Sequence, residues 1–419
     1  MRYFLLTFVF NVSLLFAYPS NLEIPQVEKL KQHISFLASD ELEGRGTGTL
    51  GFWKAADYVA HLFQEYGLKS LGENETFFQK FLVELPLHPQ RENHVFRLLS
   101  ANVIGLLPAN DKDFLDKYVV VGAHLDHLGY GGQSSLDPQS KEIHNGADDN
   151  ASGVAGVLET ARVWSQTKIK HGNIIFIVFG AEEMGLLGSL YFVEHPTYDL
   201  SKTYAMLNLD MIGRLSEDVL TLFGTGTALE WDEVLDLINS KEKLSMSKQS
   251  SGQSPSDNTS FYVHNIPVLF FNTGSHEDYH RPSDDVEFIH YEGMLKVLSF
   301  LSETLLYTTQ RYEKLTFQET KDPHGPGGGG GLPYFGTMPD YSFQGKGVKL
   351  LGVNVDSPAQ RAGLQKGDII IKLGQFEVTD VYNYTEALRA HKDGDTVSII
   401  YLRENVQYTT QATLGRKSE

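Results

Sequence analysis

Four short runs of apolar residues alternate along the chain with longer stretches in which apolar residues recur at helical spacing. Short runs rich in Val, Ile and Phe are typical of buried parallel strands, and their alternation with helices is typical of βαβ units. The sequence therefore predicts an α/β fold, with a mostly parallel-cored twisted sheet flanked by helices. The four predicted strands are Tyr118–Gly122, Ile174–Phe179, Tyr204–Leu209 and Pro267–Phe271.

Helical spacing appears before, between and after these runs. Asp149 and Asn150 stand where the third helix would begin, and both residue types are good helix caps. A further strand is predicted at Phe96–Leu107. The predicted helices are Val27–Ala38, Phe52–Tyr66, Ala151–Ser165 and His290–Thr308.

The length of 419 residues predicts more than one domain, because a single core seldom grows beyond ~250–300 residues. Residues 321–331 end in five consecutive glycines, a composition typical of a flexible linker. We therefore expect a first domain over residues 18–320 and a small, mainly-β domain over residues 332–419.

Residues 1–17 are mostly apolar and carry one early Arg, which is typical of a signal peptide; an uncleaved N-terminal anchor is the alternative. No Cys occurs, which excludes disulfides and thiolate metal ligands. Export without disulfides predicts a periplasmic or secreted protein of a bacterial cell envelope. No later stretch reaches the ~20 apolar residues of a membrane span.

The formal net charge of −18 argues against nucleic acid as a partner. The acidic excess lies before Leu332, and a solvated acidic surface is its commonest cause. An acidic field also suits a site for cations.

Five possible metal ligands lie on or near loops that follow the predicted strands. Loops at the carboxyl ends of strands meet at one crevice of an open α/β sheet, so these side chains should converge. Two His and three carboxylates can hold two divalent ions about 3.5–4 Å apart. These residues are His124, Asp148, Glu183, Asp210 and His280.

Two further carboxylates stand next to these ligands. Strand alternation places Asp126 on the side of His124, where it could accept the second imidazole N–H and fix the tautomer. Glu182 precedes Glu183, and such a pair can divide the roles of general base and ligand. Taken singly, a His-x-Asp pair or two Asp at a helix start has a structural explanation.

Two other motifs predict no chemistry. Gly46–Gly51 matches GxGxxG, but it follows a predicted helix rather than a strand. His324-Gly-Pro resembles an esterase oxyanion motif, yet the chain has no G-x-S-x-G nucleophile elbow.

The chain resembles the two-zinc aminopeptidases of the bacterial leucyl aminopeptidase and aminopeptidase S type, which share their fold with glutaminyl cyclases and the transferrin receptor ectodomain. The resemblance spans roughly Val27 to Thr308. It rests on the segments Leu37–Arg45, Gly122–His127, Gly146–Gly153, Ala181–Gly185, Asn208–Met211 and Asp278–Asp285. The residue Asn258 departs from the family, because many members have Ser-Asp-His where this chain has Ser256-Asp-Asn258.

This resemblance implies two Zn²⁺ ions per chain. Asp148 would bridge the ions, His124 and Asp210 would complete one site, and Glu183 and His280 would complete the other. Glu182 would be the general base, and Tyr279 would polarise the scissile carbonyl. The resemblance also implies a cis peptide bond between Asp148 and Asp149.

The C-terminal part resembles a PDZ domain of the bacterial envelope-protease kind, through Gly347–Val353, Asp356–Leu364 and Lys366–Ile371. Such domains bind an extended C-terminal peptide by strand addition. Residues Pro333–Gly336 would form the carboxylate loop. The alternative is a domain that only packs against the first one.

The resemblance therefore implies an exported zinc aminopeptidase that removes residues from peptide N-termini and captures substrates or partners with its PDZ domain. Three alternatives stay open on the same fold: a glutaminyl cyclase-like acyltransferase, a carboxypeptidase and a noncatalytic binding protein.

Overall fold

The computed structural model describes most of the chain. The described residues are 25–86, 95–132, 134–137, 139–215, 218–274, 276–320, 333–339, 345–353, 357–379, 383–384, 387–388 and 390–415. The predicted signal peptide (1–17) and glycine-rich linker (321–331) lie outside them.

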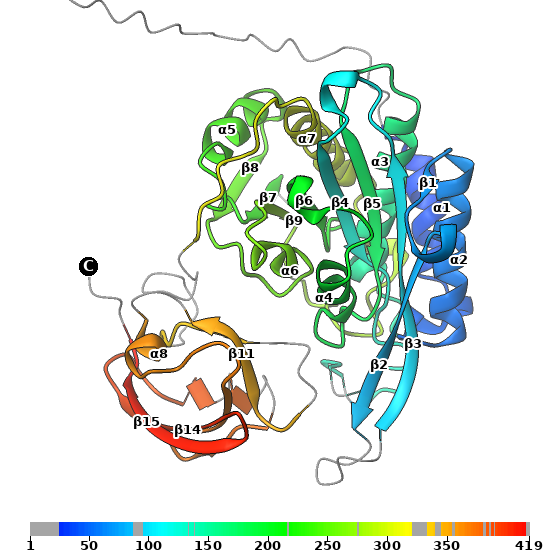
Figure 1. Cartoon of the computed structure of the whole chain (residues 1–419). Helices are drawn as coiled ribbons and strands as arrows, with labels where there is room; N and C mark the ends of the chain where they lie inside the picture. Colours follow the sequence, from blue (N-terminus) through cyan, green and yellow to red (C-terminus); the bar gives the residue numbers. More distant parts are fainter. Residues whose placement is uncertain are drawn as a thin grey trace, which may run out of the picture.

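A nine-stranded mixed sheet forms the core of the first domain (Figure 1), in the order β1-β3-β5-β4-β6-β9-β7-β8, with β2 paired to β3. The four central strands run parallel, in the order β5, β4, β6 and β9. They coincide with the four predicted runs: β4 (Tyr118–His124), β5 (Asn173–Phe179), β6 (Thr203–Leu209) and β9 (Val268–Asn272). The predicted fold class is confirmed.

Antiparallel strands flank this parallel centre. The strand β3 pairs antiparallel with β5, and β7 pairs antiparallel with β9. The hydrophobic runs predicted β3 but carried no signal for its direction. The flanking strands are β1 (Lys69–Ser70), β2 (Phe78–Pro86), β3 (Val95–Leu107), β7 (Val219–Phe223) and β8 (Ser245–Gln249).

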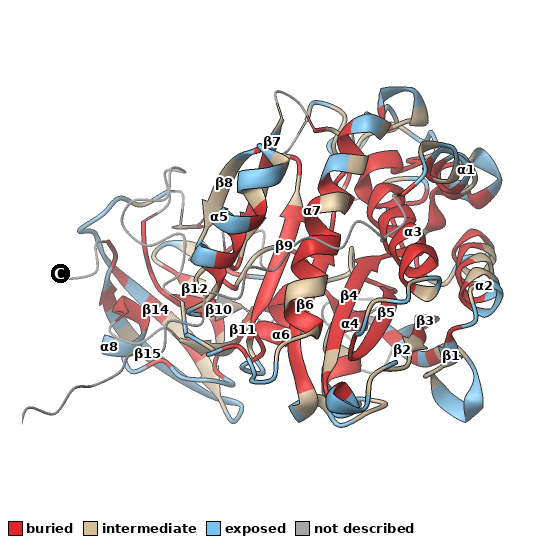
Figure 2. Cartoon of the chain, turned by 90° about the horizontal axis from the view of Figure 1, so that it is seen from above, coloured by how far each residue is buried: buried red, intermediate tan, exposed pale blue. Residues whose placement is uncertain are grey.

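Helices cover both faces of the sheet, so the central strands are buried on both sides (Figure 2). Val119 and Val121 pack into the larger core with α1 (Val27–Leu37), α2 (Leu50–Glu65), α3 (Gly153–Ser165), α5 (Trp231–Glu242) and α7 (Tyr291–Thr309). Val120 points to the opposite face, in the core of α4 (Leu187–Glu194) and α6 (Asn258–Tyr262). This alternation explains why the strands read as continuous apolar runs.

Short turns of 3-10 helix join several of these elements. They are η1 (Asp40–Arg45), η2 (Glu73–Glu75), η3 (Lys112–Phe114), η5 (Leu200–Lys202) and η6 (Val286–Phe288).

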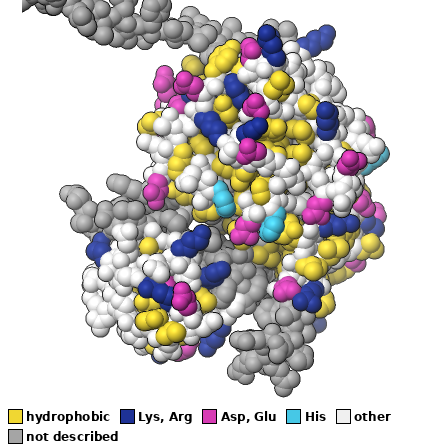
Figure 3. All heavy atoms as spheres, in the orientation of Figure 1, with side chains coloured by type: hydrophobic (Ala, Val, Ile, Leu, Met, Phe, Trp, Pro, Cys, Tyr) yellow, Lys and Arg dark blue, Asp and Glu magenta, His cyan; other side chains and the backbone are white. Residues whose placement is uncertain are grey.

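Within the described part of the chain, none of the helices combines the length and the apolar character needed to cross a bilayer. On the face shown in Figure 3, acidic and basic side chains are interspersed.

The segment after α7 packs back onto the first domain. Phe317 forms a β-bridge with Ala228, and the backbone N–H of Thr320 donates to the hydroxyl of Tyr262 over 2.8 Å. The Nζ of Lys117 donates to the backbone carbonyl of Arg311. Residues up to Thr320 therefore belong structurally with the sheet.

A second, six-stranded antiparallel sheet forms the C-terminal domain, in the order β10-β11-β12-β14-β15, with β13 paired to β12. It has a hydrophobic core of its own. A buried carboxylate, Asp368, accepts two hydrogen bonds from Arg403. The elements are β10 (Thr337–Pro339), β11 (Val348–Val353), α8 (Pro358–Arg361), β12 (Ile369–Leu373), β13 (Phe376–Glu377), β14 (Thr396–Arg403) and β15 (Val406–Thr413).

The GxGxxG match at Gly46–Gly51 has a packing explanation. A Cβ atom on Gly51 would lie 1.8 Å from the carbonyl oxygen of Leu42, so only glycine lets α2 approach η1 this closely. Gly48 has a φ of +76°, which other residues rarely adopt. These glycines serve the turn between η1 and α2.

A fully buried arginine ties the N-terminal segment to the sheet. The guanidinium of Arg45 donates to four backbone carbonyls, at 2.5 Å to Leu37, 2.9 Å to Leu125, 2.7 Å to Asn145 and 3.0 Å to Gly146. The last three carbonyls belong to the loops that follow β4 and precede α3. Arg45 therefore fixes the positions of two loops that carry predicted site residues.

We expect Arg45→Met to lower the free energy of unfolding of the first domain by at least about 3 kcal/mol, because four buried carbonyls would lose a charged donor. Urea unfolding followed by Trp fluorescence measures this, since all three Trp residues precede residue 321. Lys54→Met is the control, because its ion pair with Glu41 is exposed and worth about 1 kcal/mol or less. Equal effects of the two substitutions would contradict the role of Arg45.

Candidate metal centre

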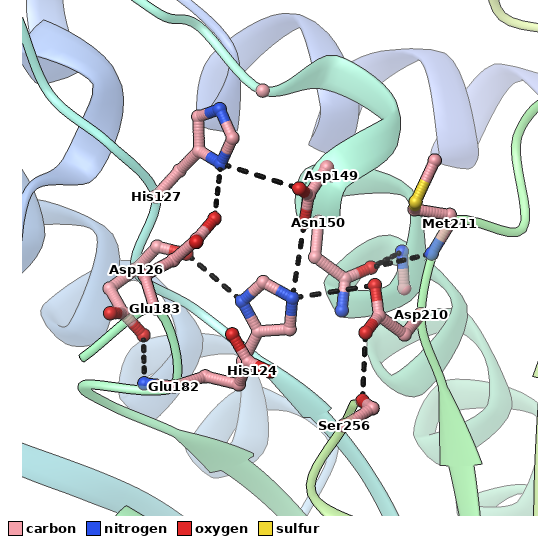
Figure 4. Close-up of polar contacts among 12 residues, drawn as sticks. His124, Asp126, His127, Asp149, Asn150, Glu182, Glu183, Asp210, Met211 and Ser256 are labelled. Carbon is pink, nitrogen blue, oxygen red and sulfur yellow. Dashed lines mark hydrogen bonds and ion pairs between the residues drawn. The ribbon is translucent and has the colours of Figure 1, made fainter. Parts of the chain in front are cut away.

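Histidine and carboxylate side chains converge at the carboxyl ends of the parallel strands (Figure 4). His124 is the last residue of β4, and Asp210 follows β6 directly. Glu183 lies in the turn after β5, and His280 lies in the loop after β9. A parallel sheet brings these loops together because each strand ends at the same edge.

One group of donors surrounds the ring of His124. Its Nε2 lies 3.2 Å from Asp149 Oδ1 and 3.4 Å from Asp210 Oδ1, and all three side chains are buried. The Nδ1–H of His124 donates to the backbone carbonyl of Asp126 over 3.0 Å. Since a carbonyl can only accept, the neutral form of this ring would turn the lone pair of Nε2 toward the two carboxylates, as a metal ligand requires. The hydroxyl of Ser256 donates to the other oxygen of Asp210.

A second group of donors surrounds the carboxylate of Glu183. The Nε2 of His280 lies 3.3 Å from Glu183 Oε2 and 3.2 Å from Asp149 Oδ2. His280 also donates its Nδ1–H to the backbone carbonyl of Ser134. On the other side, His127 Nδ1 lies 2.8 Å from Glu183 Oε1. Asp149 thus faces one donor group with each of its two oxygens.

The prediction that Asp148 bridges the two groups is wrong by one residue. Asp148 Oδ1 accepts a hydrogen bond from the Gly213 backbone N–H, and its Oδ2 lies 3.1 Å from His276 Nε2. The backbone at Asp149 is extended (φ −104°, ψ 93°), so the two neighbouring carboxylates point in different directions. The bridging position belongs to Asp149.

The predicted cis peptide bond is displaced in the same way. It joins Asp149 to Asn150, not Asp148 to Asp149. The helix predicted from Ala151 accordingly begins as α3 at Gly153, because residues Ala147–Ser152 form a wider turn.

The loop that carries Asp149 is held by the buried carboxylate of Asp284. Its Oδ2 accepts the backbone N–H groups of Asp148 and Asp149, each over 3.0 Å. Arg214 reaches Asp284 over 3.4 Å and Asp278 over 3.0 Å. Asp284 therefore links the loop of His280 to the loop of Asp149.

Glu182 lies next to the donors but belongs to neither group. Burial, together with the charges of Glu183 and Asp257, raises the pKa of Glu182 well above its ordinary value, against the opposing effect of His124. The backbone N–H of Glu182 donates to Asp126 Oδ1 over 2.9 Å. A carboxyl group in this position can accept and return a proton.

The predicted contact of the Asp126 carboxylate with His124 is absent. The backbone carbonyl of Asp126 takes that place, while its carboxylate accepts from the Glu182 N–H and from the Thr47 hydroxyl over 2.7 Å. Asp126 therefore supports both His124 and the turn of Glu182.

Tyr279 packs its ring on that of His280, with centroids 3.9 Å apart and an interplanar angle of 22°. Burial, with the neighbouring carboxylates, raises the pKa of Tyr279 above its ordinary value, so the phenol keeps its proton. Asn258, where the chain departs from the family pattern, donates to the carbonyl of Gly252 and accepts from Ser254. It is the first residue of α6, and these two bonds join it to the segment just before that helix.

The donor set fits metal ions of the zinc type. Asp149, Glu182, Glu183, Asp210 and Asp257 are crowded into one buried region. Burial raises the pKa of Asp257 to about 7, and hydrogen bonds to Asp149 and Glu183, which outweigh burial, raise the pKa of His280 to about 11. Such crowding of negative charge calls for cations. Imidazole and carboxylate donors without thiolates suit two zinc ions.

Sequence reasoning missed Asp149 and His127. Asp149 was visible in the Asp148-Asp149 pair, but spacing cannot tell which of two adjacent carboxylates faces a ligand. His127 was visible as the last residue of the run His124-Leu-Asp-His, three positions after a predicted ligand.

Comparison with known proteins agrees with this geometry. Residues 102–305 match peptidase family M28, and residues 316–414 match the PDZ domain family. Aminopeptidase YwaD of Bacillus subtilis is 31% identical over 225 residues, which cover 51% of this chain and 46% of the relative. Leupeptin-inactivating enzyme 1 of Streptomyces exfoliatus is 30% identical over 197 residues, covering 46% and 37%. The chain thus spans less than half the length of these curated relatives.

Solved structures share the fold of the first domain. A leucine aminopeptidase precursor from Bacteroides thetaiotaomicron has a TM-score of 0.55 at 17% identity, over 68% of this chain and 98% of that one. A glutaminyl cyclase from the same organism has a TM-score of 0.55 at 18% identity, over 68% and 99%. All the converging donors lie within residues 102–305, the region that matches peptidase family M28, and the region that matches the PDZ domain family follows it.

Proposed function

We propose that this protein is a zinc-dependent aminopeptidase that hydrolyses residues from peptide N-termini. The observation that carries the proposal is the place of Glu182, a half-buried residue whose carboxyl group adjoins two converging donor groups without belonging to either. The M28 match and relatives named as aminopeptidases support it.

Five residues would hold the ions. His124 and Asp210 would ligate one, Glu183 and His280 the other, and Asp149 both, in keeping with their distances to one another. Zinc bound there would supply Lewis acidity, which polarises a carbonyl oxygen and lowers the pKa of water.

Glu182 would take the proton from the attacking water and pass it to the leaving amine nitrogen. Its raised pKa suits this exchange, because the group has to hold a proton during part of the cycle. Tyr279 would donate its phenolic O–H to the carbonyl oxygen of the scissile bond. The stacking of its ring on His280 places it next to the second donor group.

The direct test combines zinc content with turnover. The full chain would be assayed on a panel of aminoacyl-anilides, with and without a chelator, and on peptides blocked at either end. An aminopeptidase cleaves peptides with a blocked C-terminus and spares those with a blocked N-terminus. The opposite preference would indicate a carboxypeptidase, a pyroglutamyl product a glutaminyl cyclase, and zinc binding without turnover a noncatalytic protein.

We propose that the PDZ domain captures peptide chains by strand addition. Among the described residues, β10 stands at the end of its sheet and directly follows Pro333–Gly336, the proposed carboxylate loop. Gly336 has a φ of +78°, a conformation that turns backbone N–H groups toward a bound anion in such loops. Export to the periplasm or medium stays a prediction from residues 1–17.

Glu182→Gln is expected to lower kcat by about 10²–10⁴-fold while zinc stays bound, because the amide cannot accept the proton. Steady-state kinetics and metal analysis of the same sample measure both effects. Glu194→Gln, an exposed change at the end of α4, is the control. Near-normal turnover of fully metallated Glu182→Gln would remove the base assignment.

Asp149→Asn and Asp148→Asn form a matched pair of substitutions. The first should weaken the binding of both zinc ions, because Asn keeps a single neutral oxygen and can no longer offer a charged oxygen to each donor group. The second should keep two ions, since an amide oxygen can still accept from Gly213. The zinc-to-protein ratio after dialysis against a weak chelator measures how many ions each variant keeps. Loss of both ions from Asp148→Asn alone would restore Asp148 as the bridge.

A chain that ends after Thr320 should fold and cleave aminoacyl-anilides at a rate close to that of the full chain. The two domains have separate hydrophobic cores, and every proposed catalytic residue lies in the first. Activity on long peptides should fall, because a tethered binding domain raises their effective concentration. Aggregation, or loss of most anilide turnover, would show instead that the PDZ domain completes the first domain.

A further inference from the structure

A third histidine points into the donor cluster. His127 follows His124 by three residues, on the segment that leaves β4, and its side chain is fully buried. Its Nδ1 lies 2.8 Å from Glu183 Oε1 and 3.7 Å from Asp149 Oδ2 (Figure 4). The ligand set proposed above leaves this nitrogen without a role.

His127 and His280 approach the same two carboxylates. His280 Nε2 lies near Glu183 Oε2 and Asp149 Oδ2, while His127 Nδ1 takes the other oxygen of Glu183 and faces the same oxygen of Asp149. The two rings are 5.8 Å apart at an interplanar angle of 66°. In contrast, His124 is the imidazole that meets Asp149 and Asp210 in the first group. The second donor group therefore contains two imidazole rings, whereas the first contains one.

The ring of His127 is held in this orientation by packing. A Cβ atom on Gly146 would lie 2.5 Å from His127 Cδ2, so the ring packs directly on the backbone of the loop that leads to Asp149. Gly146 has a φ of +59°, which reinforces the requirement for glycine. This packing turns Nδ1 toward the carboxylates.

The second nitrogen of His127 sets it apart from His124 and His280. Those two histidines donate Nδ1–H to the carbonyls of Asp126 and Ser134, which fixes their tautomers. The Nε2 of His127 is buried and has no hydrogen-bond partner among the described residues. The polar contacts of His127 are those of Nδ1, which faces the carboxylates of the donor cluster.

We propose that His127 is a further metal ligand, through Nδ1, at the position shared by His280, Glu183 and Asp149. This inference rests on the proposed two-zinc centre and makes its two positions unequal. One has two imidazoles and two carboxylates; the other has one imidazole and the carboxylates of Asp149 and Asp210. Since imidazole favours zinc-type ions, the position with His127 should fill first and empty last.

The test uses zinc titrations of the metal-free full chain against a competing indicator. The wild type should bind two ions in separate steps. His127→Ser should weaken the tighter step by more than about 100-fold, beyond the 10–100-fold cost of removing a residue that only orients a ligand. His171→Gln is the control, because His171 is equally buried but lies next to the start of β5, at the opposite end of the sheet.

His127→Asn separates ligation from positioning. The amide nitrogen of Asn stands close to the position of Nδ1 and can donate to Glu183, but it is a poor zinc ligand. If His127 ligates the metal, His127→Asn should bind zinc as weakly as His127→Ser. ¹⁵N spectra of the histidine-labelled wild type should also show that Nδ1 of His127 loses its proton and shifts when the first zinc ion binds.

Two results would overturn the inference while leaving the two-zinc proposal intact. The first is wild-type affinity in His127→Asn, and the second is a protonated Nδ1 in the fully loaded protein. Either would reduce His127 to a residue that positions Glu183. A wild-type chain that binds no zinc would overturn the two-zinc proposal itself, and this inference with it.

Discussion

The carboxylate of Asp149 is the group on which the organisation of the centre depends. One oxygen faces His124 and the other faces His280, so the two donor groups meet at a single side chain. The two donor groups can share Asp149 only because the segments that follow β4, β6 and β9 come within a few ångströms of each other. A parallel sheet meets that requirement, since its strands all end at the same edge.

Several carboxylates in one buried region repel one another, which destabilises the fold. The surrounding residues hold the backbone of the site in place against this repulsion. The guanidinium of Arg45 is buried nearby, where burial lowers its pKa to about 10 while nearby carboxylates such as Asp149 and Asp284 oppose that effect. It donates to backbone carbonyls and thus leaves the carboxylates of the cluster free for cations. Asp284 accepts the N–H groups that hold the Asp149 loop. The scaffold therefore fixes backbone positions and leaves the donors available.

The proposed function assigns peptide capture and catalysis to different domains. The residues proposed for catalysis precede α7, and the PDZ domain has a core of its own and an ion pair between Arg403 and the buried Asp368. In the proposed function, the second domain would change the affinity for a chain substrate, while the donor residues all lie in the first domain. Within the first domain, the inequality between the His124 group and the His280 group would let one ion be held more firmly than the other.

The parallel centre of the sheet could be predicted from the sequence alone. Apolar runs long enough for buried strands predicted β4, β5, β6 and β9, because a strand covered on both faces excludes polar residues from its interior. The sequence also identified the loops that carry the centre, and four of the five predicted ligands, all but Asp148, lie in the cluster. The regular period of strands and helices makes such features readable from a single sequence.

The atoms that face the centre depend on how separate loops pack against one another. Asp148 and Asp149 are identical in type and adjacent, and the backbone conformation at Asp149, held by Asp284, selects the second. His127 gained its place from the packing of its ring on Gly146, a contact between separate loops. The backbone carbonyl of Asp126, rather than its carboxylate, orients His124. These choices depend on distances between loops far apart in sequence, and residue spacing carries no information about them.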